Sequence, residues 1–592
     1  MFFATLSGLF VSSCDKAPED SVNSTESASP TSELGSYSYL DASGSRVTDV
    51  SHGYATSDKL GFVLNDDEES YSVKAANLDI KGDIVIPATY LDLPVTTISA
   101  WGFEYCEIRS LYIPKGVTTI EEHAFYGCKT LKKLFISETV SHIGSYAMKD
   151  CPSLTITVSD KNPCFSSLDG VLYNKSKTKI IRAPGSIKSF AFPKTVTSIG
   201  EDAFQGCNFL KSIVIPEGIT YIGERAFQSC VNLNEVYISR TVVTIDDSAF
   251  SGCSNLKHVD FCYDGDSRES DLSTIGRRSF FWCVRLEEVL LPDHVLSIGE
   301  EAFSDCGKAK TIRLSEDLLT IADNAFVGMS SLEEVRIPRY TYSIPETAFK
   351  GCKKLQSIDV DKNNAYFASY DGVLYNKDKT NLYICPPGKA LIDFPSSVVF
   401  FQNGAFEKCS LTHVEIPSTI KRLNTRLFYE SESLVSVKLH KGITEISRLA
   451  FARCTSLASF VVGSNIEFIG YDAFEKCTSL ADLEFKEGVS AIEGYAFSEC
   501  TSLTTLVLPN SLETIGGWGF YGCSSLTSVT FGTGLTKIDT RAFWACESLS
   551  SITYLGDMES WNKIEKTYTW NLEVPATYVK CSDGTVPLEI YD

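Results

Sequence analysis

A repeat of about 23 residues fills the sequence from about Ile98 to Ile552. Its pattern is I-G-x-x-A-F-x-x-C-x-x-L-x-x-V-x-I-P, and residues 199–207 and 222–230 are clear copies of its first half. The anchoring phenylalanine recurs at positions 103, 125, 204, 227, 250, 280, 303, 326, 349, 406, 428, 451, 474, 497, 520 and 543, with Met148 in one slot. A fixed period of this length is typical of a solenoid, whose units bury their apolar faces only against their neighbours. Most of such a chain is surface, so its default function is binding.

Each repeat contains two short extended pieces, such as 212–216 and 220–223, in which β-branched and polar residues alternate. Pro216 ends the first piece, because proline cannot donate to a β-ladder. The stretch at 224–230 is too short for much α-helix and is expected to form one tight helical or 3₁₀ turn. These features predict a β-rich solenoid of about 17 coils, with one helical turn per coil and a continuous ladder of buried phenylalanines.

Two intervals break the period and carry the same insert. The step from Met148 to Phe204 is 56 residues and the step from Phe349 to Phe406 is 57. Both contain the run D-G-V-L-Y-N-K followed by a second apolar run, which is typical of a β-hairpin. Hairpin inserts are therefore expected near 160–190 and 362–394. A third irregularity, the acidic expansion around 263–266, is expected to be a surface loop.

The remaining parts of the chain are expected to cap and tether the solenoid. Residues 37–97 are predicted to form an N-terminal cap, 98–553 the solenoid itself, and 554–592 a C-terminal cap with a short helix and a last strand. Solenoids need such caps to shield the apolar face of their end coils.

The first residues resemble a bacterial lipoprotein signal. Residues 1–11 are apolar and small, too short to span a bilayer, and end at Val-Ser-Ser-Cys, which is similar to a lipobox. Residues 1–14 are therefore expected to be a signal peptide with Cys14 as the lipidated residue, and 15–36, rich in Ser, Thr, Glu and Pro, a flexible tether. The run has no preceding Lys or Arg. This leaves open an apolar start without a signal role, or a true N-terminus upstream of Met1.

Fifteen of the 20 cysteines occupy one slot of the repeat, three residues after the anchor. The exceptions in that slot are Met329 and Ser431. A slot that accepts methionine indicates packing, and cysteine behaves there as a small buried hydrophobe. Reduced buried thiols are the expectation. Some disulfides and a metal site are the alternatives, although no zinc-type C-x-x-C spacing occurs.

The composition argues against nucleic acid as a partner. The formal net charge is −22, whereas phosphate binding needs a basic surface. The same charge disfavours direct binding to anionic lipid, so membrane contact is expected only through the lipid anchor. Hydrophobic content of 43% and charged content of 22% are ordinary for a folded soluble domain.

No pattern for catalysis, a cofactor or a metal is found. The sequence lacks G-x-S-x-G, H-E-x-x-H, a P-loop and a dinucleotide-binding glycine motif. The seven histidines fall in different repeat slots, so no column stacks two imidazoles. We therefore expect a protein that is not an enzyme and needs no cofactor.

Two surfaces are candidates for binding. The first is the outward column of the first strand, where a mixed solvated face is the alternative: Phe135, Val214, Tyr237, Asp260, Leu290, Arg313, Arg336, Asp359, Glu415, Lys438, Val461, Glu484 and Val507. The second is aromatic, in shared slots of neighbouring coils, with ordinary packing as the alternative: Tyr495, Trp518, Tyr521, Trp544, Phe281 and Trp282. Stacked aromatic rings suit sugar or protein ligands because they give contact area at little entropic cost.

The repeat unit, the two D-G-V-L-Y-N-K inserts and the W-N-x-I and C-S-D-G ending together resemble the BspA-like leucine-rich repeat proteins. The resemblance implies a curved leucine-rich solenoid on the bacterial surface that binds host matrix proteins, host cells or other bacteria. We therefore expect a lipid-anchored surface adhesion protein that captures host or microbial protein or glycan ligands. The alternative is a structural spacer of the cell envelope without a specific ligand. The resemblance fixes neither the ligand nor the oligomeric state.

Overall fold

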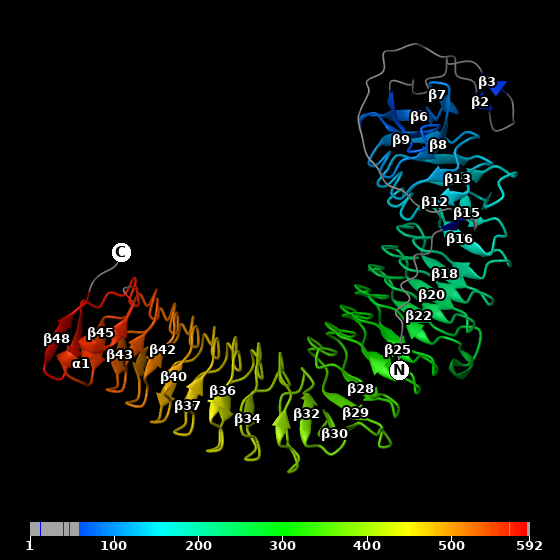
Figure 1. Cartoon of the computed structure of the whole chain (residues 1–592). Helices are drawn as coiled ribbons and strands as arrows, with labels where there is room; N and C mark the ends of the chain where they lie inside the picture. Colours follow the sequence, from blue (N-terminus) through cyan, green and yellow to red (C-terminus); the bar gives the residue numbers. More distant parts are fainter. Residues whose placement is uncertain (1–11, 14–38, 41–45, 48–58, 568, 589–592) are drawn as a thin grey trace. The chain divides into compact units, whose positions relative to one another are not determined.

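The computed structural model describes residues 12–13, 39–40, 46–47, 59–567 and 569–588. Within them the chain is a β-solenoid divided into two compact units, Met1–Leu286 and Glu287–Asp592 (Figure 1). It has about 22 turns, more than the about 17 anchor-bearing coils predicted. The difference arises because the inserts and the end segments add turns that carry no anchor phenylalanine.

The first unit builds two parallel ladders from the two extended pieces of each coil. The first pieces form β6 (Lys81–Val85), β9 (Glu107–Tyr112), β11 (Lys133–Ile136) and β13 (Thr155–Val158), and after the insert β18 (Ser212–Ile215), β20 (Glu235–Ile238) and β22 (His258–Asp260). The second pieces are β8 (Leu93–Ile98), β10 (Thr119–Ile120), β12 (His142–Ile143), β17 (Ser198–Ile199), β19 (Tyr221–Ile222), β21 (Thr244–Ile245) and β23 (Thr274–Ile275). The hairpin of β4 (Leu60–Leu64) and β5 (Tyr71–Ala75) continues the second ladder at its N-terminal end.

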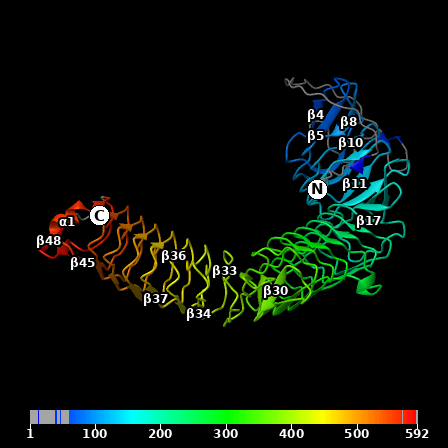
Figure 2. The same cartoon turned by 60° about the horizontal axis from the view of Figure 1, so that its bottom comes forward.

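The second unit repeats the same arrangement, and its stacked coils are visible in Figure 2. Its first pieces are β24 (Glu288–Leu290), β26 (Thr311–Arg313), β28 (Glu334–Ile337), β29 (Ser357–Val360), β34 (His413–Glu415), β35 (Ser436–Lys438), β37 (Ser459–Val462), β39 (Asp482–Phe485), β41 (Thr505–Val507), β43 (Ser528–Phe531) and β45 (Ser551–Tyr554). Its second pieces are β25 (Ser297–Ile298), β27 (Thr320–Ile321), β33 (Phe400–Phe401), β36 (Glu445–Ile446), β38 (Phe468–Ile469), β40 (Ala491–Ile492), β42 (Thr514–Ile515), β44 (Lys537–Ile538) and β46 (Glu565–Lys566).

Both inserts are antiparallel, as the D-G-V-L-Y-N-K runs predicted. Three strands meander in each: β14 (Phe165–Leu168), β15 (Val171–Asn174) and β16 (Lys179–Arg182) in the first, and β30 (Phe367–Tyr370), β31 (Val373–Asn376) and β32 (Asn381–Ile384) in the second. The Asp-Gly pair forms the first turn of each meander. The last strand of each returns to the parallel ladder of second pieces, β16 against β17 and β32 against β33. A new sheet therefore begins at each insert, because β12 and β16 belong to different sheets, as do β27 and β32.

The segment around each anchor closes hydrogen bonds from residue i+3 to residue i, as a 3₁₀ turn would, but does not continue as a helix. Residues two before and two after the anchor have positive φ, for example Arg225 (54°) and Ser229 (58°) around Phe227. Alternate amides consequently point along the solenoid. The amide of Phe204 donates to the carbonyl of Ala226 in the next coil at 2.7 Å. This turn-to-turn ladder is a third row of inter-coil hydrogen bonds.

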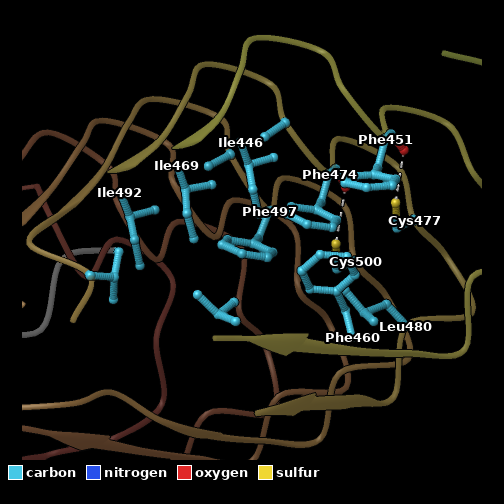
Figure 3. Packing of buried hydrophobic residues seen from close by; sticks show 14 of the residues in the cluster. Ile446, Phe451, Phe460, Ile469, Phe474, Cys477, Leu480, Ile492, Phe497 and Cys500 are labelled. Carbon is cyan, nitrogen blue, oxygen red and sulfur yellow. Dashed lines mark hydrogen bonds between the residues drawn. The ribbon is translucent and has the colours of Figure 1, made fainter. Parts of the chain in front are cut away.

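A column of stacked phenylalanines runs through the core, with buried Ile, Leu and Cys side chains around it, as Figure 3 shows for Phe451, Phe474 and Phe497. From Phe406 to Phe543 the ring centroids of successive anchors lie 4.9–5.3 Å apart. That spacing is close to the rise between neighbouring strands, about 4.8 Å, so the rings follow the ladders without strain. All of these rings are buried, and full burial of each contributes about 1.5–3 kcal/mol.

The predicted short helix and last strand are present at the C-terminal end. Helix α1 (Met558–Lys563) starts at Asp557, whose carboxylate accepts a hydrogen bond from the amide of Ser560 at 2.8 Å. Its Trp561 is buried over the last core residues. Strands β47 (Tyr578–Cys581) and β48 (Gly584–Pro587) then end the ladder as a hairpin. At the other end of the chain, Cys14 and the predicted tether at 15–36 lie outside the described residues.

Candidate functional site

An aromatic column runs along the turn segments of the second unit. Tyr495, Trp518 and Arg541 each lie two residues before an anchor, one coil apart, and all three have positive φ. The rings of Tyr495 and Trp518 are stacked with centroids 5.2 Å apart and planes within 5°. The guanidinium carbon of Arg541 lies 5.8 Å from the ring centre of Trp518. The left-handed backbone at this slot points each side chain outward, over its neighbour in the next coil.

A second aromatic pair occupies the slot one residue after the anchor. Tyr521 and Trp544 have ring centroids 5.1 Å apart and planes inclined by 46°. Arg541 also lies over Trp544, 4.7 Å from its ring centre, and so joins the pair to the column. We call Tyr495, Trp518, Tyr521, Trp544 and Arg541 the turn face. The structure brings together the four aromatic residues predicted here, and it adds Arg541, which the sequence argument overlooked.

The rings of the turn face are partly covered by one another and by Arg541. Tyr495 is 38% exposed, while Trp518, Tyr521 and Trp544 are half-buried. Trp518 lies between Tyr495 and Arg541, so both of its faces are covered. A sugar that stacks flat needs an open aromatic face, whereas a protein side chain can pack against ring edges. This geometry favours a protein ligand over a glycan at Trp518.

The charge of Arg541 is not neutralised locally. Among residues 59–567 and 569–588 it forms no ion pair, although the chain as a whole is strongly acidic. Its Nε has no hydrogen-bond partner in that part of the chain, and neither does Nε1 of Trp544. Cation–π contacts with two tryptophans hold the guanidinium in place, each contributing about 0.5–1 kcal/mol at an exposed site.

Phe281 and Trp282, the other predicted aromatic pair, lie in the first unit. Trp282 is 57% exposed, and its ring plane is within 7° of that of Phe281, with centroids 6.1 Å apart. Arg278 lies 5.6 Å from the ring centre of Phe281. The pair therefore repeats the aromatic–arginine chemistry of the turn face on a smaller scale.

The first unit contains a second aromatic column that the sequence argument did not identify. Trp101, His123 and Tyr146 occupy the slot two before the anchor, and their rings stack with centroids 3.7 Å and 4.9 Å apart. Arg225 ends this column, with its guanidinium carbon 4.7 Å from the ring centre of Tyr146. Comparing this slot across all coils would have found the column, because it is the same slot that carries Tyr495 and Trp518.

The outward-facing residues of the first strand in each coil form the other candidate binding surface. Val214, Val461 and Val507 are exposed there, as the alternation of the strands predicts. Its charged members partly pair with one another, as do Lys438 and Glu415 at 2.7 Å. These strands present a mixture of single apolar residues and self-paired charges. Scattered apolar residues of this kind are normal on a soluble surface.

No group of three or more possible metal ligands occurs in the part of the chain that the structure describes. In the same part, no helix has both the length and the apolar character required to cross a bilayer. The candidate lipidation site, Cys14, lies outside those residues.

A family model described as a BspA-type leucine-rich repeat region matches residues 96–189, 179–271, 273–384, 389–481 and 469–567. These segments cover most of the chain. A comparison with curated protein sequences finds no match.

Several solved structures are similar over most of their length. A leucine-rich cell surface protein from Faecalibacterium prausnitzii is 22% identical, with 86% of this chain and 97% of that chain covered and a TM-score of 0.30. A leucine-rich repeat protein from Bacteroides ovatus is also 22% identical, with 88% and 98% covered and a TM-score of 0.31. The pneumococcal vaccine antigen PcpA is 16% identical, with 89% and 98% covered and a TM-score of 0.33.

Proposed function

Because the chain belongs to the BspA-type leucine-rich repeat family, we propose that it is a non-catalytic, surface-displayed binding protein whose turn face captures a protein partner. The partner is a surface protein of a host cell or of another bacterium. Solenoids use such extended surfaces for binding, because every coil adds one row of side chains to the same face.

One observation carries the proposal: Arg541 is held between Trp518 and Trp544 without an ion pair in the described part of the chain. Tryptophan, tyrosine and arginine are the residue types that most often dominate binding energy at protein interfaces. Here four aromatic rings and one arginine lie within three neighbouring coils. A spacer protein would need no such cluster.

The chemistry of the turn face also describes the partner. The rings of Tyr495 and Tyr521 offer apolar contact, and the guanidinium of Arg541 has unused donors. A partner segment with an aliphatic or aromatic side chain beside a carboxylate matches both features. The glycan alternative is weaker at this site, because the faces of Trp518 are covered.

The experiment that tests the proposal uses the mature chain on a combined protein and glycan array. We expect wild-type chain to bind protein features, and Trp518→Ala with Trp544→Ala to lose that binding. The matched control is Val461→Ala with Val507→Ala, which removes exposed side chains from the strand surface and should leave binding intact. Loss of binding only in the valine variant would place the ligand on the strand surface. No binding by any variant would favour the spacer function.

Surface display is proposed to depend on lipidation of Cys14. The order of an apolar run, Val-Ser-Ser-Cys and a Ser/Thr/Pro-rich segment supports this assignment. A lipidated cysteine that carries more than one acyl chain anchors stably, whereas a single chain would not. Replacing Cys14 with Ser should move the protein from the membrane fraction to the soluble fraction. Unchanged partitioning of that variant would contradict the anchor.

A further inference from the structure

The first insert opens a small cleft in the first unit. The turn segment at 144–150 is followed in the chain by the insert instead of by the next turn. The cleft, about 90 Å³, is lined by residues 143–149, by Lys179, Ile181 and Arg182 of β16, and by residues 200–202. The corresponding cleft at the second insert is only about 10 Å³. Since one water needs about 10–15 Å³, the first cleft has room for a small ligand group and the second does not.

The side chains around the first cleft include three cations, of which Lys179 interacts electrostatically with Glu201 of the same lining. Lys149, Lys179 and Arg182 line it, and none of them forms an ion pair within the described residues. Arg182 is only 4% exposed. Its Nη1 donates to the carbonyl of Asp202 at 2.7 Å, while its Nε has no partner there. A buried guanidinium satisfied mainly by carbonyl oxygens retains its charge uncompensated.

The two carboxylates of the lining are already engaged. Arg225 pairs with Asp202, with Nε 3.0 Å from Oδ1, and also with Glu201. Glu201 and Lys179 are both partly buried, and this burial raises the pKa of Glu201 and lowers the pKa of Lys179. The aliphatic end of Lys179 passes over Gly200, where a Cβ would come within 3.0 Å of Lys179 Cε. The carbonyl oxygen of Ile180 would be nearer still, at 2.5 Å, so Gly200 is required mainly by the close approach of the β16 backbone.

The second insert shows what the first one lacks. There Glu407, with a side chain 5% exposed, is bound by Lys350 at 3.1 Å and by Arg426 at 3.0 Å. The equivalent of Glu407 at the first insert, one residue after the anchor, is the neutral Gln205. Thus the second site contains an internal carboxylate between its cations.

The cationic positions of the two inserts also differ. Lys350 and Arg426 correspond to Lys149 and Arg225, so both sites keep these two cations. Lys179 and Arg182 of the first insert correspond to the uncharged residues at 381 and 384 of the second. The lining of the first cleft therefore has two more positive charges than that of the second, while each lining contains two carboxylates, Glu201 and Asp202 in the first and Glu346 and Glu407 in the second.

From this comparison we propose that the first-insert cleft binds an oxyanion, a carboxylate or sulfate group, between Lys149, Lys179 and Arg182. The anion takes the place that the carboxylate of Glu407 fills at the second insert. Arginine and lysine suit this chemistry because charge-assisted hydrogen bonds to oxyanions are about twice as strong as neutral ones. The site is separate from the turn face, which lies in the other unit.

The test is calorimetric titration of the full chain at constant ionic strength. Sodium sulfate, sodium glucuronate and glucose are the probes; sulfate tests a free anion, glucuronate a carboxylate carried on a sugar, and glucose the sugar alone. Sulfate also stabilises proteins without binding them, but that effect does not saturate and does not depend on one side chain. Saturable binding by sulfate or glucuronate, with none by glucose, is the expected result.

Two variants copy the second insert: Arg182→Ile and Lys179→Asn. Each substitution should weaken binding of the anion about tenfold or more. Lys188→Asn removes an exposed lysine after the same insert and is the matched control, expected to stay within about twofold of wild type. Thermal unfolding in chloride shows whether each variant is folded. If Arg182→Ile does not fold, the comparison is made with Lys179→Asn alone. Absence of saturable binding, or equal binding by all folded variants, would overturn the site.

Discussion

The thiol of Cys477 donates a hydrogen bond to the carbonyl oxygen of Phe451, one coil earlier, at 3.2 Å. The same oxygen also accepts from the amide of Cys454 in its own coil, at 3.1 Å. Thiols of the column make this contact repeatedly, and Figure 3 shows it for Cys477 and Cys500. Ser431 makes the equivalent bond to Phe406 with its hydroxyl, at 2.6 Å. With the exception of Met329, the slot therefore holds a small side chain that carries a donor, which the packing argument alone did not include.

Replacing Cys477 with Ala removes both the thiol volume and the donor, and we expect a loss of about 1 kcal/mol in the free energy of unfolding. Cys477→Ser keeps a donor and should lie closer to wild type. Urea unfolding followed by tryptophan fluorescence measures both. Ser431→Ala is the control and should lose stability for the same reason. A serine variant less stable than the alanine variant would show that packing alone decides the slot.

The buried thiols predict a loss of stability at alkaline pH. Burial raises the pKa of Cys151 and Cys352 to about 12, from 9.0 for an ordinary thiol. The folded state favours the neutral thiol, so the stabilisation is full below pH 9 and is lost as the pH rises toward 12. Burial also raises the pKa of Tyr173 to about 12, which adds to the effect.

Thermal unfolding measured from pH 8 to pH 11 should therefore give a midpoint that falls with increasing slope. Cys352→Ser removes one titrating group. Between pH 8 and pH 10 the free energy of unfolding should fall in both proteins, but in the variant it should fall by about 1.4 kcal/mol less than in wild type. An unchanged pH dependence in this variant would contradict the assignment.

Because the turn segments contain residues with positive φ, replacing such a residue by glycine should not destabilise the protein as it usually would. Ser229 and Gly252 occupy the same slot, with φ of 58° and 73°, and a Cβ at Gly252 would meet only ordinary contacts beyond 3.4 Å. The main energetic difference between glycine and another residue in this slot is then the backbone strain of a residue with a Cβ at positive φ. Gly252→Ala should cost about 1 kcal/mol, and Ser229→Gly should be neutral or stabilising by a similar amount. Chemical denaturation compares the two, and a clearly destabilising Ser229→Gly would contradict the strain argument.

A buried asparagine holds each insert to the coil before it. Nδ2 of Asn364 donates to the carbonyls of Pro338 and Thr341, and Oδ1 accepts from the amides of Tyr366 and Phe367, all within 2.9 Å. Asn162 makes the same four bonds at the first insert.

Asn364→Ala leaves these backbone groups without partners and should cost about 2–4 kcal/mol. Its neighbour Asn363 is exposed, so Asn363→Ala is a matched control with an expected effect below about 0.5 kcal/mol. Hydrogen exchange should show faster exchange of the amides of Tyr366 and Phe367 in Asn364→Ala. Equal stability of the two variants would remove the structural role given to Asn364.

The repeat predicts the solenoid, the phenylalanine ladder and the antiparallel inserts because each depends on local spacing. It does not predict the left-handed residues, because Arg225 and Trp518 are not glycines and only the inter-coil hydrogen bonds hold them at positive φ. The signal was present at Gly206 and Gly252, where glycine occupies one of the two left-handed slots.

The aromatic part of the turn face was predictable, because Tyr495 and Trp518 share a slot one period apart. Arg541 shares that slot too, but its role depends on two rings in neighbouring coils and appears only in the folded chain. The cleft at the first insert is harder still, because it depends on a missing turn segment beside Arg182.

The most direct test of the central claim is the affinity of the turn face for the protein that binds most strongly on the array. Biolayer interferometry should compare wild type, Trp518→Ala, Trp544→Ala and Arg541→Ala with the control Val507→Ala. Each turn-face variant should weaken binding tenfold or more, about 1.4 kcal/mol, while the control should stay within about twofold of wild type. Wild-type affinity in all three folded turn-face variants would contradict the claim that this face binds the partner.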